Sequence, residues 1–173
     1  IVEELRTLAL SNAGQLDLQY SRLDLAVEAE AALLSLEDHF SKAGITVMRQ
    51  LSSAVVSADR ARLRQAFVAV LENCCRYAPQ STVHVETGVA GQYVFFRCTD
   101  TGPGFPEESR TRAFERFWRA DDSRGRSGGG SGLGLPIVRA IARAHGGDAS
   151  IFPSDHPGLA VEIRLPCQVL PFV

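Results

Sequence analysis

The chain has 173 residues, a length that suits one domain with a sizeable core, and its 45% hydrophobic and 22% charged content is ordinary for a globular protein. A formal net charge of −2 gives no general attraction to nucleic acid or to an anionic membrane surface, so we expect no nucleic-acid partner. No stretch approaches the roughly 20 consecutive apolar residues that cross a bilayer.

The chain begins on Ile1, and its first residues are amphipathic and charged, unlike a signal peptide. We therefore expect a piece of a longer protein. The four cysteines match no zinc-binding spacing and predict free thiols in a reducing compartment; they are Cys74, Cys75, Cys98 and Cys167.

The first predicted elements are a helix end over residues 1–12, terminated by Gly14, and a short strand over residues 15–20. Asp24 is typical of an N-cap and predicts a helix that continues to residue 43. Within this helix, apolar residues recur at spacings of three and four and form one stripe: Ala26, Ala29, Leu33, Leu36 and Phe40.

Gly44 is expected to end that helix, and residues 45–49 and 54–57 have the composition of strands. Asp59 then predicts the start of a helix over residues 60–77. The apolar residues expected to face inward from this helix are Leu63, Phe67, Val70, Leu71 and Cys74.

The later elements are expected in this order: strands over 82–87 and 93–99 around a turn at 88–91, a helix over 133–145 ended by Gly146-Gly147, and strands over 149–152 and 159–165. Residues 101–131 are the least regular part of the sequence. The elements together predict an α+β fold with a mainly antiparallel sheet and helices on one face, without a second domain.

The segment Asp100-Thr-Gly-Pro-Gly104 directly follows an apolar predicted strand. A carboxylate at a strand end can accept a hydrogen bond from an exocyclic amine, which would select adenine over guanine. Gly102 and Gly104 would let a flat ring approach the main chain. A simple turn in which Asp100 bonds its own backbone explains the same residues, and this alternative stays open.

The segment Gly128-Gly-Gly-Ser-Gly-Leu-Gly134 precedes an apolar helix. Its backbone N–H groups and the helix N-terminus could hold a polyphosphate, although a flexible linker has the same composition. A P-loop is excluded because no Gly-Lys-Ser/Thr follows. A dinucleotide-binding fingerprint is excluded because no strand immediately precedes the glycines.

Asn73, Arg76 and Tyr77 are spaced i, i+3 and i+4, so they share one face of their predicted helix. The neutral carbonyl of Asn73 suits Mg²⁺, which prefers oxygen ligands. Arg76 can meet phosphate and Tyr77 can lie against a base ring. A solvated helix end would show the same three residues, and this alternative also stays open.

In this order and spacing, the three segments resemble the catalytic and ATP-binding domain of sensor histidine kinases, within the wider group of ATPases that includes gyrase, Hsp90 and MutL. The resemblance runs from about Leu23 to Pro166, and it includes Phe114-Glu-Arg-Phe117 between the two glycine segments. It implies a two-layer α/β sandwich of the Bergerat type. It further implies residues 1–20 as the end of a dimerisation helix and linker, 21–168 as the ATP-binding domain, and 169–173 as a tail.

The resemblance implies a role for each matching residue. Asn73 would ligate Mg²⁺ and act in catalysis, Arg116 would reach the γ-phosphate, and Phe114 and Phe117 would pin a mobile lid over about 105–131, starting at Phe105. The nucleotide-binding residues would be Asn73, Arg76, Tyr77, Asp100, Gly102, Gly104, Phe117, Gly130, Gly132, Leu133, Gly134 and Leu135.

ATP and Mg²⁺ are thus the implied cofactors. The implied partners are a histidine-bearing dimerisation domain of the same protein and a response regulator. The parent would be a homodimer in the bacterial inner membrane, with this domain in the cytoplasm. The phosphoacceptor motif of the family is absent around all four histidines, which are His39, His84, His145 and His156.

The sequence departs from the family at Ala69, where a second asparagine is usual. Gyrase-type and Hsp90-type relatives carry a glutamate at this position, which acts as the general base for water. Glu72 adjoins Asn73 and points roughly 100° away around the helix, so no carboxylate is expected to activate water. A second departure is Leu159-Ala160, where a Thr or Ser is frequent. The rival functions are a gyrase-like or Hsp90-like ATP hydrolase and a degenerate nucleotide-binding module.

Overall fold

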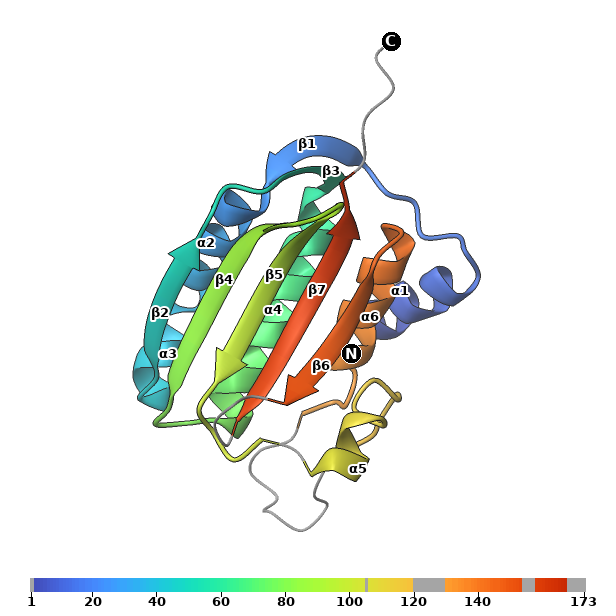
Figure 1. The fold of residues 1–173 in the computed structure, drawn as a ribbon. Helices are drawn as coiled ribbons and strands as arrows, with labels where there is room; N and C mark the ends of the chain where they lie inside the picture. Colours follow the sequence, from blue (N-terminus) through green and yellow to red (C-terminus); the bar gives the residue numbers. More distant parts are fainter. Residues whose placement is uncertain (1, 105, 120–129, 154–157, 168–173) are drawn as a thin grey trace.

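The computed structural model describes residues 2–104, 106–119, 130–153 and 158–167. Its helices and strands follow one another in the order shown in Figure 1: α1 (Val2–Asn12), β1 (Tyr20–Asp24), α2 (Leu25–Ser35), α3 (Glu37–Ala43), β2 (Thr46–Leu51), β3 (Val55–Asp59), α4 (Arg60–Tyr77), β4 (Thr82–Ala90), β5 (Tyr93–Asp100), α5 (Glu107–Arg110), α6 (Gly134–Ala144), β6 (Asp148–Pro153) and β7 (Leu159–Pro166).

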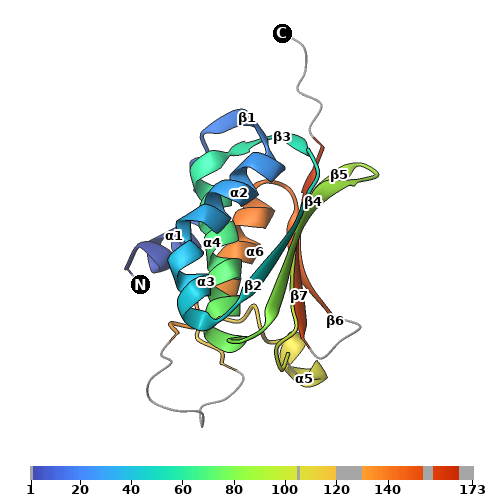
Figure 2. The ribbon, with the colours of Figure 1, turned by 90° about the vertical axis from the view of Figure 1, so that its left-hand side faces the viewer.

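The main sheet has five strands in the order β2-β4-β5-β7-β6. The β2–β4 pair is parallel and the other three pairs are antiparallel, so the sheet is mixed. Helices α2, α4 and α6 lie on one face of this sheet, as the side view in Figure 2 shows. The predicted α+β fold with helices on one face is therefore confirmed.

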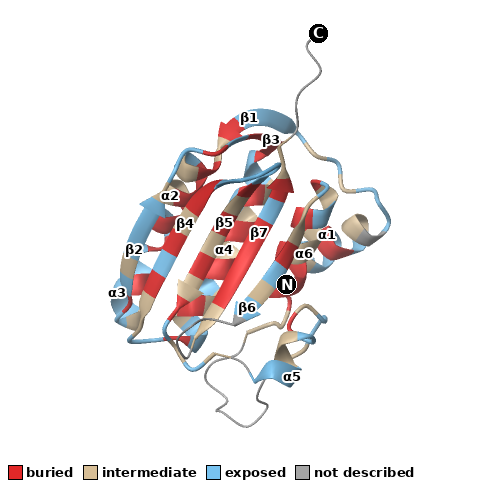
Figure 3. Cartoon of the chain, in the orientation of Figure 1, coloured by how far each residue is buried: buried red, intermediate tan, exposed pale blue. Residues whose placement is uncertain are grey.

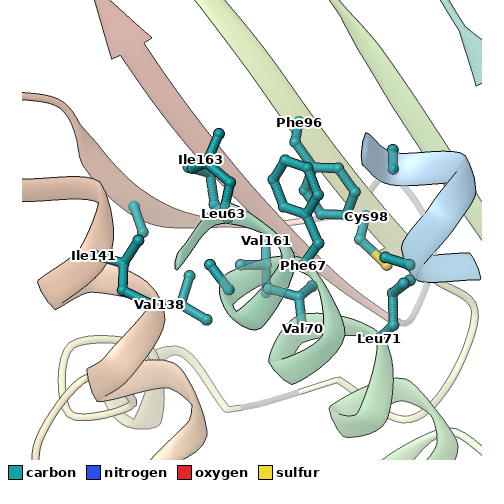
Figure 4. Close-up of a cluster of buried hydrophobic side chains, with 14 of the residues drawn as sticks. Leu63, Phe67, Val70, Leu71, Phe96, Cys98, Val138, Ile141, Val161 and Ile163 are labelled. Atoms are coloured by element: carbon teal, nitrogen blue, oxygen red, sulfur yellow. The ribbon is translucent and has the colours of Figure 1, made fainter. Parts of the chain in front are cut away.

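The hydrophobic core lies between the sheet and helices α2, α4 and α6, and Figure 3 shows buried positions on both of these layers. Phe67 of α4 stacks on Phe96 of β5, with ring centroids 4.1 Å apart and ring planes 12° from parallel. Figure 4 shows Leu63 and Ile141 reaching into the same layer from α4 and α6. Full burial of such a side chain stabilises the fold by about 1.5–3 kcal/mol, so this layer fixes both helices against the sheet.

Three polar contacts of Asp59 set the start of α4, the helix that carries Asn73. Its side chain accepts hydrogen bonds from the backbone N–H of Arg62 at 3.0 Å, as predicted for an N-cap, and from that of Gln19 at 2.8 Å. Its own N–H donates to Nε2 of His145 at 3.0 Å. The beginning of α4 is therefore tied to the end of α6 and to the chain that precedes β1.

The helix predicted from residue 25 to residue 43 is interrupted. Leu36 has φ −113° and ψ 10°, which divides the segment into α2 and α3 although the side chain of Leu36 is buried. The N–H of Leu36 bonds the carbonyl of Leu33 at 3.1 Å, a tightened last turn. Neither glycine nor proline marks this break, so the apolar stripe runs through it.

Two further boundaries differ from the prediction. The first strand is Tyr20–Asp24 rather than residues 15–20, because β3 pairs with it only from Asp59, opposite Tyr20, to Val55, opposite Asp24. Strand β4 continues through Gly88 to Ala90, and Gly91, with φ 61°, forms the turn to β5. Gly88 lies in the ladder opposite Phe95, where a Cβ would be 3.0 Å from the ring.

Helix α1 packs against α6. Leu8 is 3% exposed, and the hydroxyl of Ser11 donates to the carbonyl of Ala140 at 3.3 Å. All four cysteines are free, as predicted, although the Sγ atoms of Cys74 and Cys98 lie 3.5 Å apart in the core. None of the helices in the described ranges is long and apolar enough to span a membrane.

Candidate nucleotide-binding site

A cavity of about 480 Å³ lies beside the C-terminal half of α4, at the ends of β5 and β7 and the beginning of α6. This volume is within the range of small-molecule sites. Eight of the predicted nucleotide-binding residues line it: Asn73, Arg76, Tyr77, Asp100, Gly104, Gly132, Gly134 and Leu135. The fold therefore brings three segments, separated in sequence by about 25–30 residues each, to one hollow.

Asp100 ends β5 at one end of this cavity and is 7% exposed. Its Oδ1 accepts a hydrogen bond from the N–H of Gly102 at 2.8 Å, so the turn that was the alternative explanation of these residues exists. Burial raises the pKa of this carboxyl, against lowering by hydrogen bonds from the backbone of Gly102 and Leu159. Because Asp100 also lines the cavity, the turn and a ligand-binding role are compatible.

Neighbouring atoms leave no room for a side chain at either of the two glycines that follow Asp100. A Cβ at Gly102 would lie 2.5 Å from the Cβ of Ala78, the residue that caps the end of α4. Gly104 has φ 66°, in the left-handed region, and a Cβ there would lie 2.7 Å from the carbonyl oxygen of Gly158. Gly104 lines the cavity, whereas Gly102 supports Asp100 from behind.

The α4 face contributes Asn73, Arg76 and Tyr77 to the cavity, as their spacing predicted. The guanidinium carbon of Arg76 lies 6.0 Å from the ring centroid of Tyr77, whose side chain is 43% exposed. The stripe extends one and two turns further toward the start of the helix through Ala69 and Gln65, which also line the cavity.

The glycine segment lies against the α4 face. A Cβ at Gly134 would lie 3.6 Å from Oδ1 of Asn73, and one at Gly130 would lie 2.8 Å from Nη1 of Arg76. Gly134 is the first residue of α6, whose N-terminal turn lines the cavity and favours an anion there. Leu133 is fully buried and does not line the cavity, so it anchors the segment to the core.

The residues predicted to form the lid are placed only in part. Phe114 is half-buried against the core, with the guanidinium of Arg139 4.8 Å from its ring centroid. Phe117 is 62% exposed, so its side chain does not pin the segment; its N–H instead donates to the carbonyl of Gly132 at 3.0 Å. Phe105 and residues 120–129, including Gly128 and Gly129, lie outside the described residues, as do residues 154–157 and 168–173.

Arg116 is exposed and does not line the cavity, whereas Arg119 does. The sequence predicts Arg116 because this arginine stands inside the Phe-containing motif. Phe117, between the two arginines, has φ 62°, so the chain from Arg116 to Arg119 does not continue as a regular helix. Such a backbone conformation has no signal in the sequence, because a phenylalanine rarely adopts it.

Two carboxylates line the cavity that the sequence argument set aside or missed. Glu72 lines it from α4, since it is three residues from Ala69 and so shares that face. Glu4 lines it from α1, and the hydroxyl of Ser131 donates to its Oε2 at 3.4 Å. The expectation that no carboxylate activates water stays a prediction, because lining the cavity does not by itself place Glu72 or Glu4 beside an attacking water.

Gln65 was also missed, although its position eight residues before Asn73 places it on the same helix face. Trp118 also lines the cavity, and no motif or helical spacing in the sequence predicts this, because its position depends on the fold of residues 106–119. Among the described residues, no group of three or more His, Cys, Asp or Glu side chains could hold a metal ion.

The match to a family model agrees with this geometry. Residues 58–169 match the family described as histidine kinase-, DNA gyrase B-, and HSP90-like ATPase. The chain is similar to the signal transduction histidine-protein kinase BaeS of Escherichia coli, with 32% identity over 97% of this chain and 36% of BaeS. It is similar to the sensor histidine kinase YkoH of Bacillus subtilis, with 32% identity over 95% of this chain and 36% of YkoH.

Among solved structures, the histidine kinase AdeS of Acinetobacter baumannii superposes with a TM-score of 0.81 at 28% identity, over 96% of this chain and 77% of that one. The chain thus spans about a third of the length of the curated relatives named above. The cavity is formed by the same segments that carry the sequence motifs, within the matched region. The chain belongs to the histidine kinase-, DNA gyrase B- and HSP90-like ATPase family, as a catalytic and ATP-binding domain of the sensor histidine kinase type.

Proposed function

We propose that this domain binds ATP with Mg²⁺ and transfers the γ-phosphoryl group to a histidine on a dimerisation domain of the same protein. The observation that carries the proposal is the position of Asp100 and Asn73 in one cavity, with the glycine segment against Asn73. Asp100 suits an adenine, and Asn73 with the glycine segment suits a triphosphate, so one molecule of ATP could contact both parts of the cavity.

The roles follow from position. Asp100 accepts a hydrogen bond from the adenine amine through the lone pairs that Gly102 and Leu159 do not use, and Tyr77 lies against the ring. Arg76 meets the phosphates beside Gly130, and the first turn of α6 adds positive potential. Arg119, rather than Arg116, is the arginine in position to reach the γ-phosphate.

The donor set fits Mg²⁺. The amide of Asn73 faces the cavity beside Gly134, and an amide oxygen is a suitable ligand for a hard cation that keeps several waters. The lack of a carboxylate and histidine cluster in the described ranges agrees with a cation held mainly by phosphate and water. When bound, Mg²⁺ would neutralise phosphate charge, while the chain's own residues hold and orient the nucleotide.

The acceptor histidine would come from another domain. His145 is buried and bonded to the backbone of Asp59 and of Ile141, while His39 and His84 are exposed on α3 and β4. We infer that residues 1–20 continue a dimerisation helix of a homodimeric parent, whose membrane part and response-regulator partner belong to the rest of the protein. The domain itself would then work in the cytoplasm of a bacterium.

A hydrolase is the second candidate, and Glu72 favours it because its carboxylate lines the cavity. The two functions are separated by measuring phosphate release and phosphoryl transfer on the same preparation. We expect slow release of free phosphate and rapid labelling of a dimerisation domain supplied with its histidine. Rapid release without an acceptor would establish the hydrolase, and tight Mg-ATP binding without transfer would establish a degenerate binding module.

The Asn73→Asp variant tests the site assignment. The added charge lies where the triphosphate and Mg²⁺ are proposed, so we expect ATP affinity and transfer to fall by roughly 10-fold or more. Calorimetric titration with Mg-ATP and a transfer assay measure both effects, and the melting temperature of the variant controls for misfolding. If binding and transfer stay intact, Asn73 is not a ligand of the nucleotide–metal complex.

A further inference from the structure

We infer that Gln65 is a positioning residue for the γ-phosphate, an inference that rests on the proposed ATP site. The cavity extends along α4 from Tyr77 past Asn73 to Gln65, and Asp100 lines it as well. Gln65 is eight residues before Asn73, which is about 12 Å along a helix axis. An ATP molecule with its base at Asp100 therefore points its phosphates toward Gln65.

The orientation of the Gln65 amide is fixed by Arg62. Nη1 of Arg62 lies 3.1 Å from Oε1 of Gln65, and a guanidinium can only donate, so the carbonyl of the amide must face it. The amide nitrogen, with its two N–H groups, therefore points away from Arg62. No described protein atom accepts a hydrogen bond from it.

Arg62 is itself held in place. The same Nη1 donates to Oγ1 of Thr7 at 3.2 Å, and Thr7 is a residue of α1 that is 1% exposed. The chain of contacts from Thr7 through Arg62 to Gln65 presents an N–H donor whose direction is fixed before any ligand arrives. Preorganised donors of this kind bind a phosphate oxygen without reorganisation.

Ala69 explains why this position matters. Ala69 lies on the same α4 face between Gln65 and Asn73, lines the cavity and has no polar group to offer. Glu72, on the same face, and Glu4 are carboxylates that would repel a triphosphate. The neutral amide of Gln65 is thus the donor on this part of α4 that can contact the terminal phosphate.

The variant Gln65→Met tests the inference, because methionine keeps the length of the side chain and a similar helix propensity but has no N–H donor. Affinities for ADP and for a non-hydrolysable ATP analogue are measured with Mg²⁺ on the full chain. We expect the ATP analogue to bind roughly 10- to 100-fold more weakly, the effect of losing a hydrogen bond to a charged group. We expect ADP affinity to stay within about two-fold, because ADP lacks the γ-phosphate.

Two more variants exclude a structural explanation. Gln65→Glu keeps an acceptor for Arg62 but removes the N–H donors, so the ratio of ATP to ADP affinity should fall at least as far. In Gln65→Met/Ala69→Asn, an amide returns one turn away on the same face and should restore most of the ratio. Gln50→Met, an exposed glutamine on β2, is the matched control and should change neither affinity.

Either of two results would overturn the inference: equal weakening of ATP and ADP by Gln65→Met, or an unchanged ratio in both Gln65 variants. Failure of the proposed ATP site gives a different result, because the unsubstituted chain would then bind neither nucleotide, and failure of phosphoryl transfer alone is seen in the separate transfer assay. Melting temperatures of all variants identify any loss of folded protein. Loss of folded protein would weaken the binding of ATP and ADP alike, so it cannot explain weaker binding of the ATP analogue alone.

Discussion

Asp100 is a buried carboxylate whose environment opposes its charge. Its pKa is raised by burial, yet it keeps a backbone donor in Gly102. Asn at position 100 would keep an oxygen for Gly102 and put an N–H group where the carboxylate accepted a bond. We therefore expect Asp100→Asn to lower ATP affinity roughly 10- to 100-fold and to reduce the preference for ATP over GTP.

Calorimetric titrations with ATP and GTP check this prediction. Guanine has a carbonyl where adenine has its amine, so the substituted amide suits GTP better than the native carboxylate does. Thr99→Val, on the neighbouring half-buried position of β5, controls for general changes at the strand end. If the ratio of ATP to GTP affinity does not change, Asp100 does not read the base.

At the scale of single residues, the sequence predicts those site members that stand in dense motifs. Asp100 and Gly132 are predicted because glycines stand beside them, and Asn73 because Arg76 and Tyr77 follow it at helical spacing. Gln65 was missed because it stands alone in a helix, and Glu4 because only the packing of α1 on α6 brings it to the cavity. Tertiary contacts of that kind leave no local pattern.

At the scale of elements, the glycine segment and the turn at Phe117 form one unit. Gly132 has φ 68°, and a Cβ there would lie 2.8 Å from Cα of Phe117, which is backbone and cannot rotate aside. We expect Gly132→Ala to displace both segments and to lower ATP affinity several-fold, with a loss of unfolding free energy of about 1–3 kcal/mol.

The matched control is Gly91→Ala in the turn between β4 and β5. Gly91 has a similar φ of 61° but nothing within 4 Å of its would-be Cβ. It therefore tests the backbone strain alone, about 1–2 kcal/mol, without the clash. Equal ATP affinities for the two variants, measured by titration beside chemical unfolding, would contradict the coupling of Gly132 to the site.

His145 joins the end of α6 to the start of α4, and it makes this joint sensitive to pH. The Ile141 carbonyl, 2.8 Å away, can only accept, so Nδ1 carries the proton and Nε2 accepts from the N–H of Asp59. Burial lowers the pKa of His145 from its ordinary 6.5, although the Ile141 bond and the charge of Asp59 oppose this.

The unfolded chain therefore binds a proton at this histidine more readily than the folded one. Stability from this group is complete above about pH 6.5 and is lost as the pH falls below that value. His145→Gln keeps an acceptor for the N–H of Asp59 but does not titrate. In this variant the free energy of unfolding should therefore fall less as the pH drops below about 6.5. Urea unfolding at about pH 5.5 and about pH 7.5 measures the change in unfolding free energy for both proteins. If the change is the same in both, His145 is not the source of this pH dependence.

The whole molecule shows which features a sequence can specify. The layers, the helix caps at Asp24 and Asp59 and the ends at Gly44 and Gly146 follow from periodicity and capping chemistry. The break at Leu36 and the start of β1 do not, since the first lacks a breaker residue and the second depends on a partner strand. Local chemistry therefore determines which helices and strands form, and pairing between distant segments determines the residues at which some of them begin and end.

Burial differs between the helices, so we expect their local stability to differ as well. Helix α4 has six buried residues along its length, whereas on α1 only Thr7 and Leu8 are buried among the side chains that the structure describes. Elements with few buried apolar contacts open locally, below the free energy of global unfolding. We therefore expect amide hydrogens of α1 to exchange much faster than those of α4.

Leu8→Ala tests whether α1 is an independently opening unit. Among the described side chains of α1, Leu8 is the buried apolar one, so its removal should accelerate exchange in α1 while exchange in α4 stays unchanged. Leu5→Ala, at a residue that is 38% exposed, is the control and should change little. Equal acceleration in α1 and α4 would mean that α1 belongs to the cooperative core. If α1 opens alone, the segment that presents Thr7 to Arg62 can detach without unfolding the nucleotide site.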